Sequence, residues 1–134
     1  MITGPCSLDT SVAMRLLVGA PESQYERAML FLEEQRSART AVHVSDQVLA
    51  EAYFALQSFY QIPKVDALEM LFQFTLGSGV VATPLAMEIL GRPKLATAKP
   101  GFVDLLIHGE SQALGHTLVT FEKAAKKLPA TVVL

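Results

Sequence analysis

The alternation of short nonpolar segments with longer amphipathic segments limits most strongly the folds open to this chain of 134 residues. The strand-like segments are Cys6–Asp9, Thr40–Val44, Val80–Ala82, Thr117–Thr120 and Thr131–Leu134. Nonpolar residues at helical spacing fill the stretches between them. Strands that alternate with helices are typical of an α/β fold whose parallel sheet is covered on both faces. We therefore predict a three-layer α/β/α sandwich with a central, mostly parallel five-stranded sheet.

Cap residues and helix breakers indicate where the predicted helices begin and end. Candidate N-caps precede three of them: Thr10 or Ser11, then Ser45, then Thr83. Gly115 is typical of a left-handed stop after a helix over Phe102–Leu114. No repeat, low-complexity stretch or long linker divides the chain, so we expect one domain over residues 1–134.

Composition narrows the class of protein and its compartment. The chain is 51% hydrophobic and 18% charged, which is typical of a globular protein. No nonpolar run approaches the roughly 20 residues of a membrane span, and Met1–Pro5 does not resemble the start of a signal peptide. Cys6 is the only cysteine, which excludes an internal disulfide and is compatible with a reducing compartment. We expect a cytoplasmic protein without membrane contact.

Four acidic residues lie after predicted strands or near the starts of predicted helices. Asp9 ends the first strand, Glu51 lies in the helix after the second, Asp104 begins the helix before the fourth, and Glu122 follows that strand. Strand ends and the starts of the following helices share one edge of a parallel sheet, so these carboxylates can converge. Mutual repulsion would then favour a hard cation, Mg²⁺ or Mn²⁺. Such a site suits hydrolysis of a phosphodiester.

Net charge gives a weak opposing indication. The formal charge of -2 disfavours a dedicated nucleic-acid binder, which usually carries a basic excess. With the four acids assigned to a metal site, the rest of the chain carries +2, which permits contact with phosphates.

Four segments in order resemble the motifs of PIN domains. Leu8–Val12 resembles the opening motif, Val44–Glu51 the second, Gly101–Ile107 the third and Leu114–Glu122 the fourth. The resemblance covers nearly the whole chain. Each motif alone has low specificity, and their order and spacing carry the signal.

The resemblance implies a metal-dependent nuclease most similar to VapC-type toxin ribonucleases. It implies Asp9, Glu51 and Asp104 as the principal acids around Mg²⁺ or Mn²⁺, with Ser11 and Thr120 as polar supports. It further implies an RNA substrate, a homodimer and a small antitoxin partner. Glu122 departs from the aspartate usual in the fourth motif, so its direct contact with metal is in doubt.

Each acid also has a simpler interpretation. Asp9 could cap the following helix, and Asp104 could complement a helix dipole. Glu51 could face solvent, although its nonpolar neighbours make this less expected, and Glu122 could be a solvated surface residue.

Other residues leave similar alternatives open. The basic residues Arg15, Arg92, Lys94 and Lys99 could hold phosphates or simply be solvated, and His108 could flank the cleft. The aromatic residues Tyr53, Phe54, Phe59, Tyr60, Phe72 and Phe74 are interpreted mostly as core.

Two other functions compete with a nuclease. One is a catalytically weak PIN-like module that binds RNA or protein. The other is a phosphoacceptor receiver domain, which needs an early acidic pair and an aspartate after the third strand. Asp9 stands alone early, and no aspartate follows Val80–Ala82.

Overall fold

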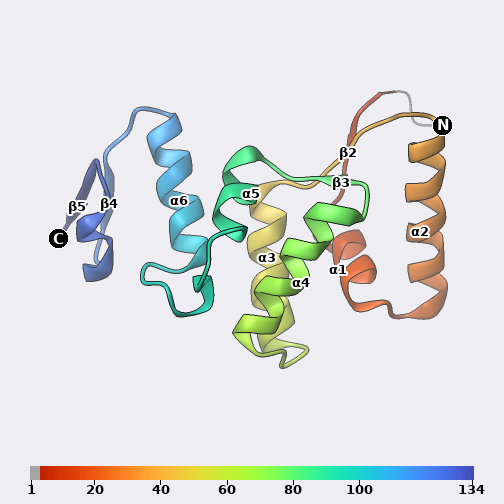
Figure 1. Cartoon of the computed structure of the whole chain (residues 1–134), viewed down its shortest axis with the longest axis horizontal. Coiled ribbons are helices and arrows are strands. Elements are labelled where there is room, and N and C mark those ends of the chain that lie inside the picture. The colour runs from red at the N-terminus through yellow and green to blue at the C-terminus, as the bar shows by residue number, and fades with distance from the viewer. Residues whose placement is uncertain (1–3) are drawn as a thin grey trace.

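The computed structural model describes residues 4–134 and confirms the α/β class: helices alternate with short parallel strands (Figure 1). Residues 1–3, which enter the signal-peptide expectation, lie outside this range. The helices are α1 (Thr10–Val18), α2 (Glu22–Ser37), α3 (Asp46–Ser58), α4 (Lys64–Gly77), α5 (Pro84–Leu90) and α6 (Phe102–Ala113). The strands are β1 (Cys6–Ser7), β2 (Val42–His43), β3 (Val80–Val81), β4 (Leu118–Thr120) and β5 (Thr131–Val133). Short 3₁₀ helices cover Leu95–Thr97 and Lys123–Lys127.

Side-chain caps fix the starts of three helices. Ser45 Oγ accepts a hydrogen bond from the Val48 amide at 3.1 Å, and Thr83 caps α5 in the same way, as predicted. The prediction of Thr10 or Ser11 as the first cap was wrong, because the Asp9 carboxylate accepts the Val12 amide at 3.2 Å. Thr10 is already the first residue of α1.

Strands β1, β2 and β3 form one parallel sheet in that order, with Cys6 opposite Val42 and Val42 opposite Val80. Their nonpolar side chains enter a core shared with α3 and α4. The largest fully buried members are Phe102, Leu49, Leu56, Leu71, Ile89, Val42 and Val44. This core holds the ends of β1 and β2 against the start of α1 and α3.

The fourth and fifth strands form a separate parallel sheet, in which Val119 lies opposite Val132. Within residues 4–134 the structure therefore has sheets of three and two strands, where the sequence predicted one sheet of five. Helix α6 lies between the two sheets and packs against α5 where Leu85 meets Gly109 (Figure 1). Strand β4 thus lies on the far side of α6 from β1 (Figure 1).

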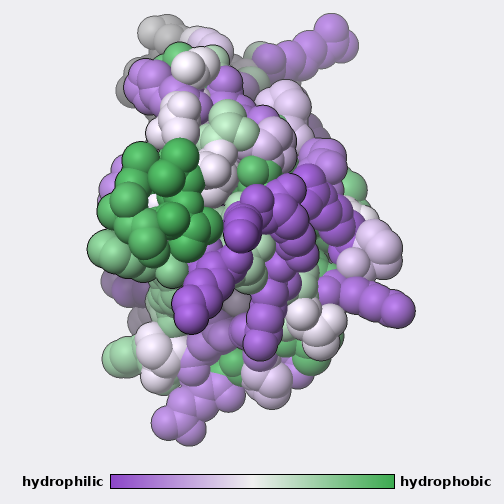
Figure 2. Space-filling model, turned by 90° about the vertical axis from the view of Figure 1, so that its left-hand side faces the viewer, coloured by the Kyte–Doolittle hydropathy of each residue, from purple (hydrophilic) through white to green (hydrophobic). Residues whose placement is uncertain are grey.

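The small sheet leaves nonpolar side chains in contact with solvent. Val119 is 57% exposed and Val132 47% exposed, and Phe121 and Leu134 are also exposed. Figure 2 views the molecule from this end and shows hydrophobic groups gathered beside a band of hydrophilic ones. Within the described residues, no helix has the length and nonpolar character to cross a membrane.

Candidate functional site

Two of the predicted acids lie where β1 ends beside α3. Ser11 Oγ donates to Asp9 Oδ1 at 2.6 Å, and Thr10 Oγ1 donates to Glu51 Oε2 at 2.9 Å. The start of α1 thus contacts both carboxylates through adjacent hydroxyl groups. Ser11, predicted as a polar support near a metal, thus bonds Asp9, whereas Thr10 was not predicted to have a role at the site.

The Asp9 carboxylate is held in its charged form. The Ser11 hydroxyl, and then the Val12 amide, lower its pKa below the ordinary value of 3.8. Both bonds use Oδ1, so the capping role and a role at a metal site do not compete for the same oxygen. Asp9 therefore caps α1 and remains a candidate ligand.

Glu51 lies on the exposed face of α3. Gln47, Glu51, Phe54 and Ser58 follow one another at helical spacing, and all four are exposed. The simpler interpretation of Glu51 as a solvent-facing residue thus describes its position. Its hydrogen bond to Thr10 nevertheless fixes the carboxylate near the start of α1.

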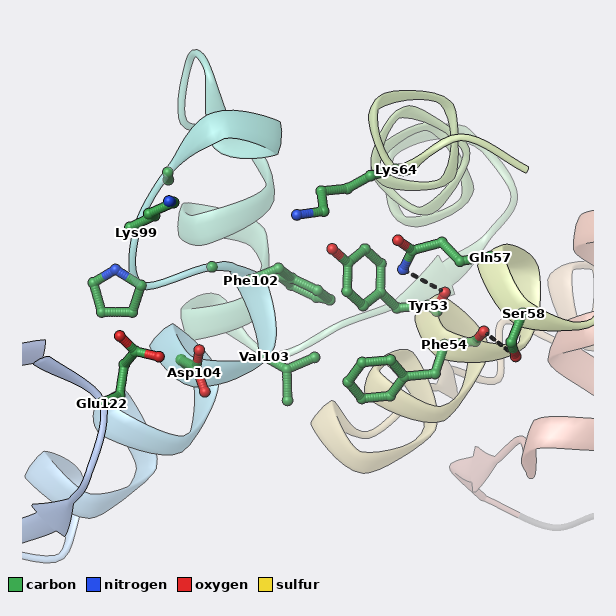
Figure 3. A pocket seen from close by; sticks show the side chains of 13 residues that line it. Tyr53, Phe54, Gln57, Ser58, Lys64, Lys99, Phe102, Val103, Asp104 and Glu122 are labelled. Carbon is green, nitrogen blue, oxygen red and sulfur yellow. Dashed lines mark hydrogen bonds between the residues drawn. The ribbon is translucent and has the colours of Figure 1, made fainter. Parts of the chain in front are cut away.

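The other two acids line a cavity of about 650 Å³ between α3, the loop before α6 and the segment after β4. Asp104 comes from the first turn of α6, and Glu122 follows β4; Figure 3 shows their carboxylates on the same side of the cavity. Lys64 lies across from them, and Lys99 lies on their own side of the cavity (Figure 3). Acidic and basic groups therefore share one concave surface.

Local contacts shape the Glu122 side of this cavity. Thr120 Oγ1 accepts a hydrogen bond from the backbone amide of Glu122 at 2.9 Å, and its predicted role as a polar support near a metal stays a prediction. Glu122 Oε1 accepts the Ala124 amide at 3.2 Å and caps the following 3₁₀ helix. One carboxylate oxygen of Glu122 is thus engaged with its own backbone.

The structure does not bring the predicted acids into one group. Across residues 4–134, no three His, Cys, Asp or Glu side chains lie close enough to hold a single metal ion. The expected convergence assumed that all strands share one sheet edge. Because β4 pairs with β5 and not with the first sheet, Asp9 and Glu51 lie in one place and Asp104 and Glu122 in another.

The remaining candidates occupy different positions. In the predicted basic loop, Arg92 is paired with Glu88 and Lys94 borders another depression, so only Lys99 of that loop lines the cavity. Outside the loop, Arg15 donates a hydrogen bond to Gln24. His108 does not flank the cavity. It is buried, and its Nε2 bonds the Pro129 carbonyl at 2.8 Å.

Sequence reasoning missed the aromatic wall of the cavity and Lys64. Phe54 is 55% exposed and Phe59 is 78% exposed, so both were wrongly assigned to the core. The helical spacing of Phe54 with Glu51 and Ser58 was the available signal. For Lys64 the signal was its place directly after Pro63 at the start of α4.

A second acidic contact lies outside the predicted site. Asp46 accepts a hydrogen bond from Thr83 and lies beside Glu110 of α6. The hydrogen bond with Asp46, then burial and charge repulsion, raise the pKa of Glu110 above its ordinary value of 4.5. This contact joins α6 to the start of α3.

Comparisons of the chain with protein-family models, curated proteins and solved structures found no match.

Proposed function

We propose that this chain is a metal-dependent endoribonuclease of the PIN type, similar to a VapC toxin. The observation that carries the proposal is the cavity that Asp104 and Glu122 share with Lys64 and Lys99. Carboxylates can hold a divalent cation, while lysines attract the phosphates of a nucleic acid. We propose RNA as the substrate because four segments of the sequence resemble, in order, the motifs of PIN-domain ribonucleases.

The donor set at the cavity fits Mg²⁺ or Mn²⁺. Both ions prefer oxygen ligands, and Mg²⁺ is commonly held by one or two carboxylates together with waters and substrate phosphates. The Asp104 carboxylate and Oε2 of Glu122 would supply the oxygen ligands, since Oε1 of Glu122 accepts the Ala124 amide. The cation would supply positive charge against the phosphodiester, while the lysines position the RNA backbone.

Asp9 and Glu51 would form a second acidic place beside the cavity, at the start of α1 and on the exposed face of α3. The exposed face of α3 runs from Glu51 to Phe54 at the cavity wall, which supports one continuous RNA path past both acidic places. The five-stranded sheet implied by the resemblance would need β4 to pair with β1. A crystal structure with Mn²⁺ and RNA would test that rearrangement.

The test is cleavage of RNA with Mg²⁺ or Mn²⁺ by the purified protein. We expect EDTA to abolish cleavage, and Asp104→Asn and Asp9→Asn to lower its rate by about 10²-fold or more, as loss of an electrostatic stabiliser does. Glu26→Gln, an exposed acid on α2, is the matched control and should cleave normally. Undiminished cleavage by both aspartate variants would overturn the proposal.

A non-catalytic RNA- or protein-binding module is the second candidate. The division of the four acids between two places favours it, because each place alone offers few ligands. Titration with Mn²⁺ in a calorimeter separates the two functions. Binding that Asp104→Asn removes favours the nuclease, and no binding at millimolar Mn²⁺ favours the module.

The proposal includes a cytoplasmic location, a homodimer and a small antitoxin as expected features of a VapC-like toxin. Light scattering of the purified chain tests the dimer. Copurification from cells that carry the neighbouring genes tests the antitoxin.

A further inference from the structure

The wall of the cavity opposite the carboxylates is aromatic. Phe54 and Tyr53 of α3 lie beside Phe102, the first residue of α6. The Tyr53 ring is 5.4 Å from both, edge-on to Phe102 and tilted against Phe54. With about 650 Å³, the cavity has the size of ordinary small-ligand sites.

Phe54 presents an aromatic ring that the core does not use. It is 55% exposed on the outer face of α3, while its neighbour Tyr53 is buried and braces it. A ring that is already held in place at a cavity wall loses little conformational freedom when a ligand binds. Exposed aromatic rings of this kind stack unpaired nucleobases.

Lys64 and Lys99 share the cavity with Asp104 and Glu122, but neither lysine forms an ion pair in the part of the chain that the structure describes. Within residues 4–134 the ion pairs are Arg36–Glu33 and Arg92–Glu88, and neither contains a lysine. Lys64 is the first residue of α4, where the helix dipole disfavours a cation. Its position therefore does not stabilise the helix, whereas the ammonium and the helix start together attract an anion.

We infer that this cavity binds single-stranded RNA through one unpaired base stacked on Phe54, with the flanking phosphates against Lys64 and Lys99. A base inside a duplex is already stacked on both faces, so the ring can engage only an unpaired one. The next phosphodiester then lies beside Asp104 and Glu122. This inference rests on the proposed function only in taking RNA as the ligand.

The experiment measures fluorescence anisotropy of a short unstructured RNA carrying a 5′ fluorescein, alone and annealed to its complement. EDTA is present throughout, so metal-dependent cleavage cannot consume the probe. We expect the single strand to bind at least about tenfold more tightly than the duplex. Equal affinity for the two forms would overturn the inference.

Matched variants locate the base and the phosphates. Phe54→Ala should weaken binding by about 5- to 150-fold, the range given by loss of one stacked base, whereas Phe54→Tyr should bind normally. Phe59→Ala removes a more exposed ring outside the cavity and should bind normally. If Phe54→Ala is folded by circular dichroism and binds like the unmodified chain, the inference fails.

Salt dependence checks the two lysines. Lys64→Gln and Lys99→Gln should each lower the slope of log Kd against log salt by about 0.7, while Lys94→Gln, which borders a different depression, should not. If polyglutamate displaces the labelled RNA as effectively as unlabelled RNA of the same charge, the inference is also overturned. Such a result would mean that binding depends on negative charge alone and not on stacking against the ring.

The outcomes separate this inference from the proposed function. Stacking-dependent binding without cleavage supports the inference and favours the binding module. Cleavage that is independent of Phe54 supports the nuclease and overturns the inference.

Discussion

The region from β1 to α5 and the region from α6 to β5 are held together in different ways. All core members but four lie in the first region: Leu95 lies in the 3₁₀ helix that connects the two regions, and Phe102, Leu105 and Leu106 lie in α6. The three-stranded sheet is buried at Val42 and Val80, whereas the two-stranded sheet exposes Val119 and Val132. Nonpolar burial therefore stabilises the first region far more than the second.

A few directed contacts hold the second region. Gly109 lets α6 approach Leu85, and His108 bonds the Pro129 carbonyl ahead of β5. A two-stranded sheet is marginally stable alone, so β4 and β5 depend on these contacts with α6. Because Asp104 and Glu122 belong to this region and Asp9 and Glu51 to the first, its placement determines which acids can act together.

The largest difference should appear when equivalent nonpolar groups are removed from the two regions. Leu56→Ala in α3, at a fully buried position, should lower the free energy of unfolding by about 2–5 kcal/mol. Val132→Ala in β5 should lower it by about 0.5 kcal/mol or less, because that side chain is half exposed. Urea unfolding followed by circular dichroism measures both, and similar losses would contradict the comparison.

The contact between the two regions can be tested by placing a side chain at Gly109, where α6 packs against Leu85. A Cβ atom at position 109 would lie 2.5 Å from Leu85 Cδ1, so Gly109→Val should destabilise the protein by about 1–3 kcal/mol. Adding Leu85→Ala should recover part of that loss by vacating the space. Thermal unfolding of the two single variants and the double variant gives the coupling, and strict additivity would exclude this contact as the link.

The bond between His108 and Pro129 should govern the second region alone. His108→Phe removes the hydrogen-bonding nitrogen but keeps a ring, and should cost about 0.5–1.5 kcal/mol. We expect the amides of Val119 and Val132 to exchange hydrogen faster, while those of Val42 and Val80 change little. Uniform acceleration across both sheets would show that the two regions unfold as one unit.

The smallest expected effect concerns Glu110 and its neighbour Asp46. Because the pKa of Glu110 is raised, its favourable contribution is present below its ordinary value of 4.5 and is lost as pH rises through the folded-state pKa. Glu110→Gln keeps a donor for Asp46 without the repulsion. It should raise Tm by about 1–2 °C at neutral pH and by nothing near pH 4. Thermal scans across pH test this, and a pH-independent difference would contradict it.

Local sequence signals predicted the elements well. Ser45, Thr83 and Gly115 marked helix limits because capping and a left-handed backbone depend on neighbouring residues. The sheet was predicted less well, because strand pairing depends on contacts between distant segments. Leu85 meets Gly109 where α6 packs on α5, and β4 pairs with β5 and not with the first sheet; no local pattern in either segment signals this arrangement.

The candidate site follows the same division. Ser11 and Thr120 were predicted as polar supports near a metal, and they bond the Asp9 carboxylate and the Glu122 backbone amide, both near in sequence. Bringing Asp9 and Asp104 together required the tertiary arrangement of two regions, which local patterns do not encode. Phe54 was misassigned because nonpolar character was given more weight than helical spacing.

The half-exposed ring of Phe54 also gives this protein an optical reporter. The chain contains no tryptophan, so Phe54→Trp would place its only indole on the cavity wall. Emission excited in the red edge of the indole band would come from that position alone. A stacked base would quench it, so occupancy of the cavity could be followed in real time without labelling the ligand.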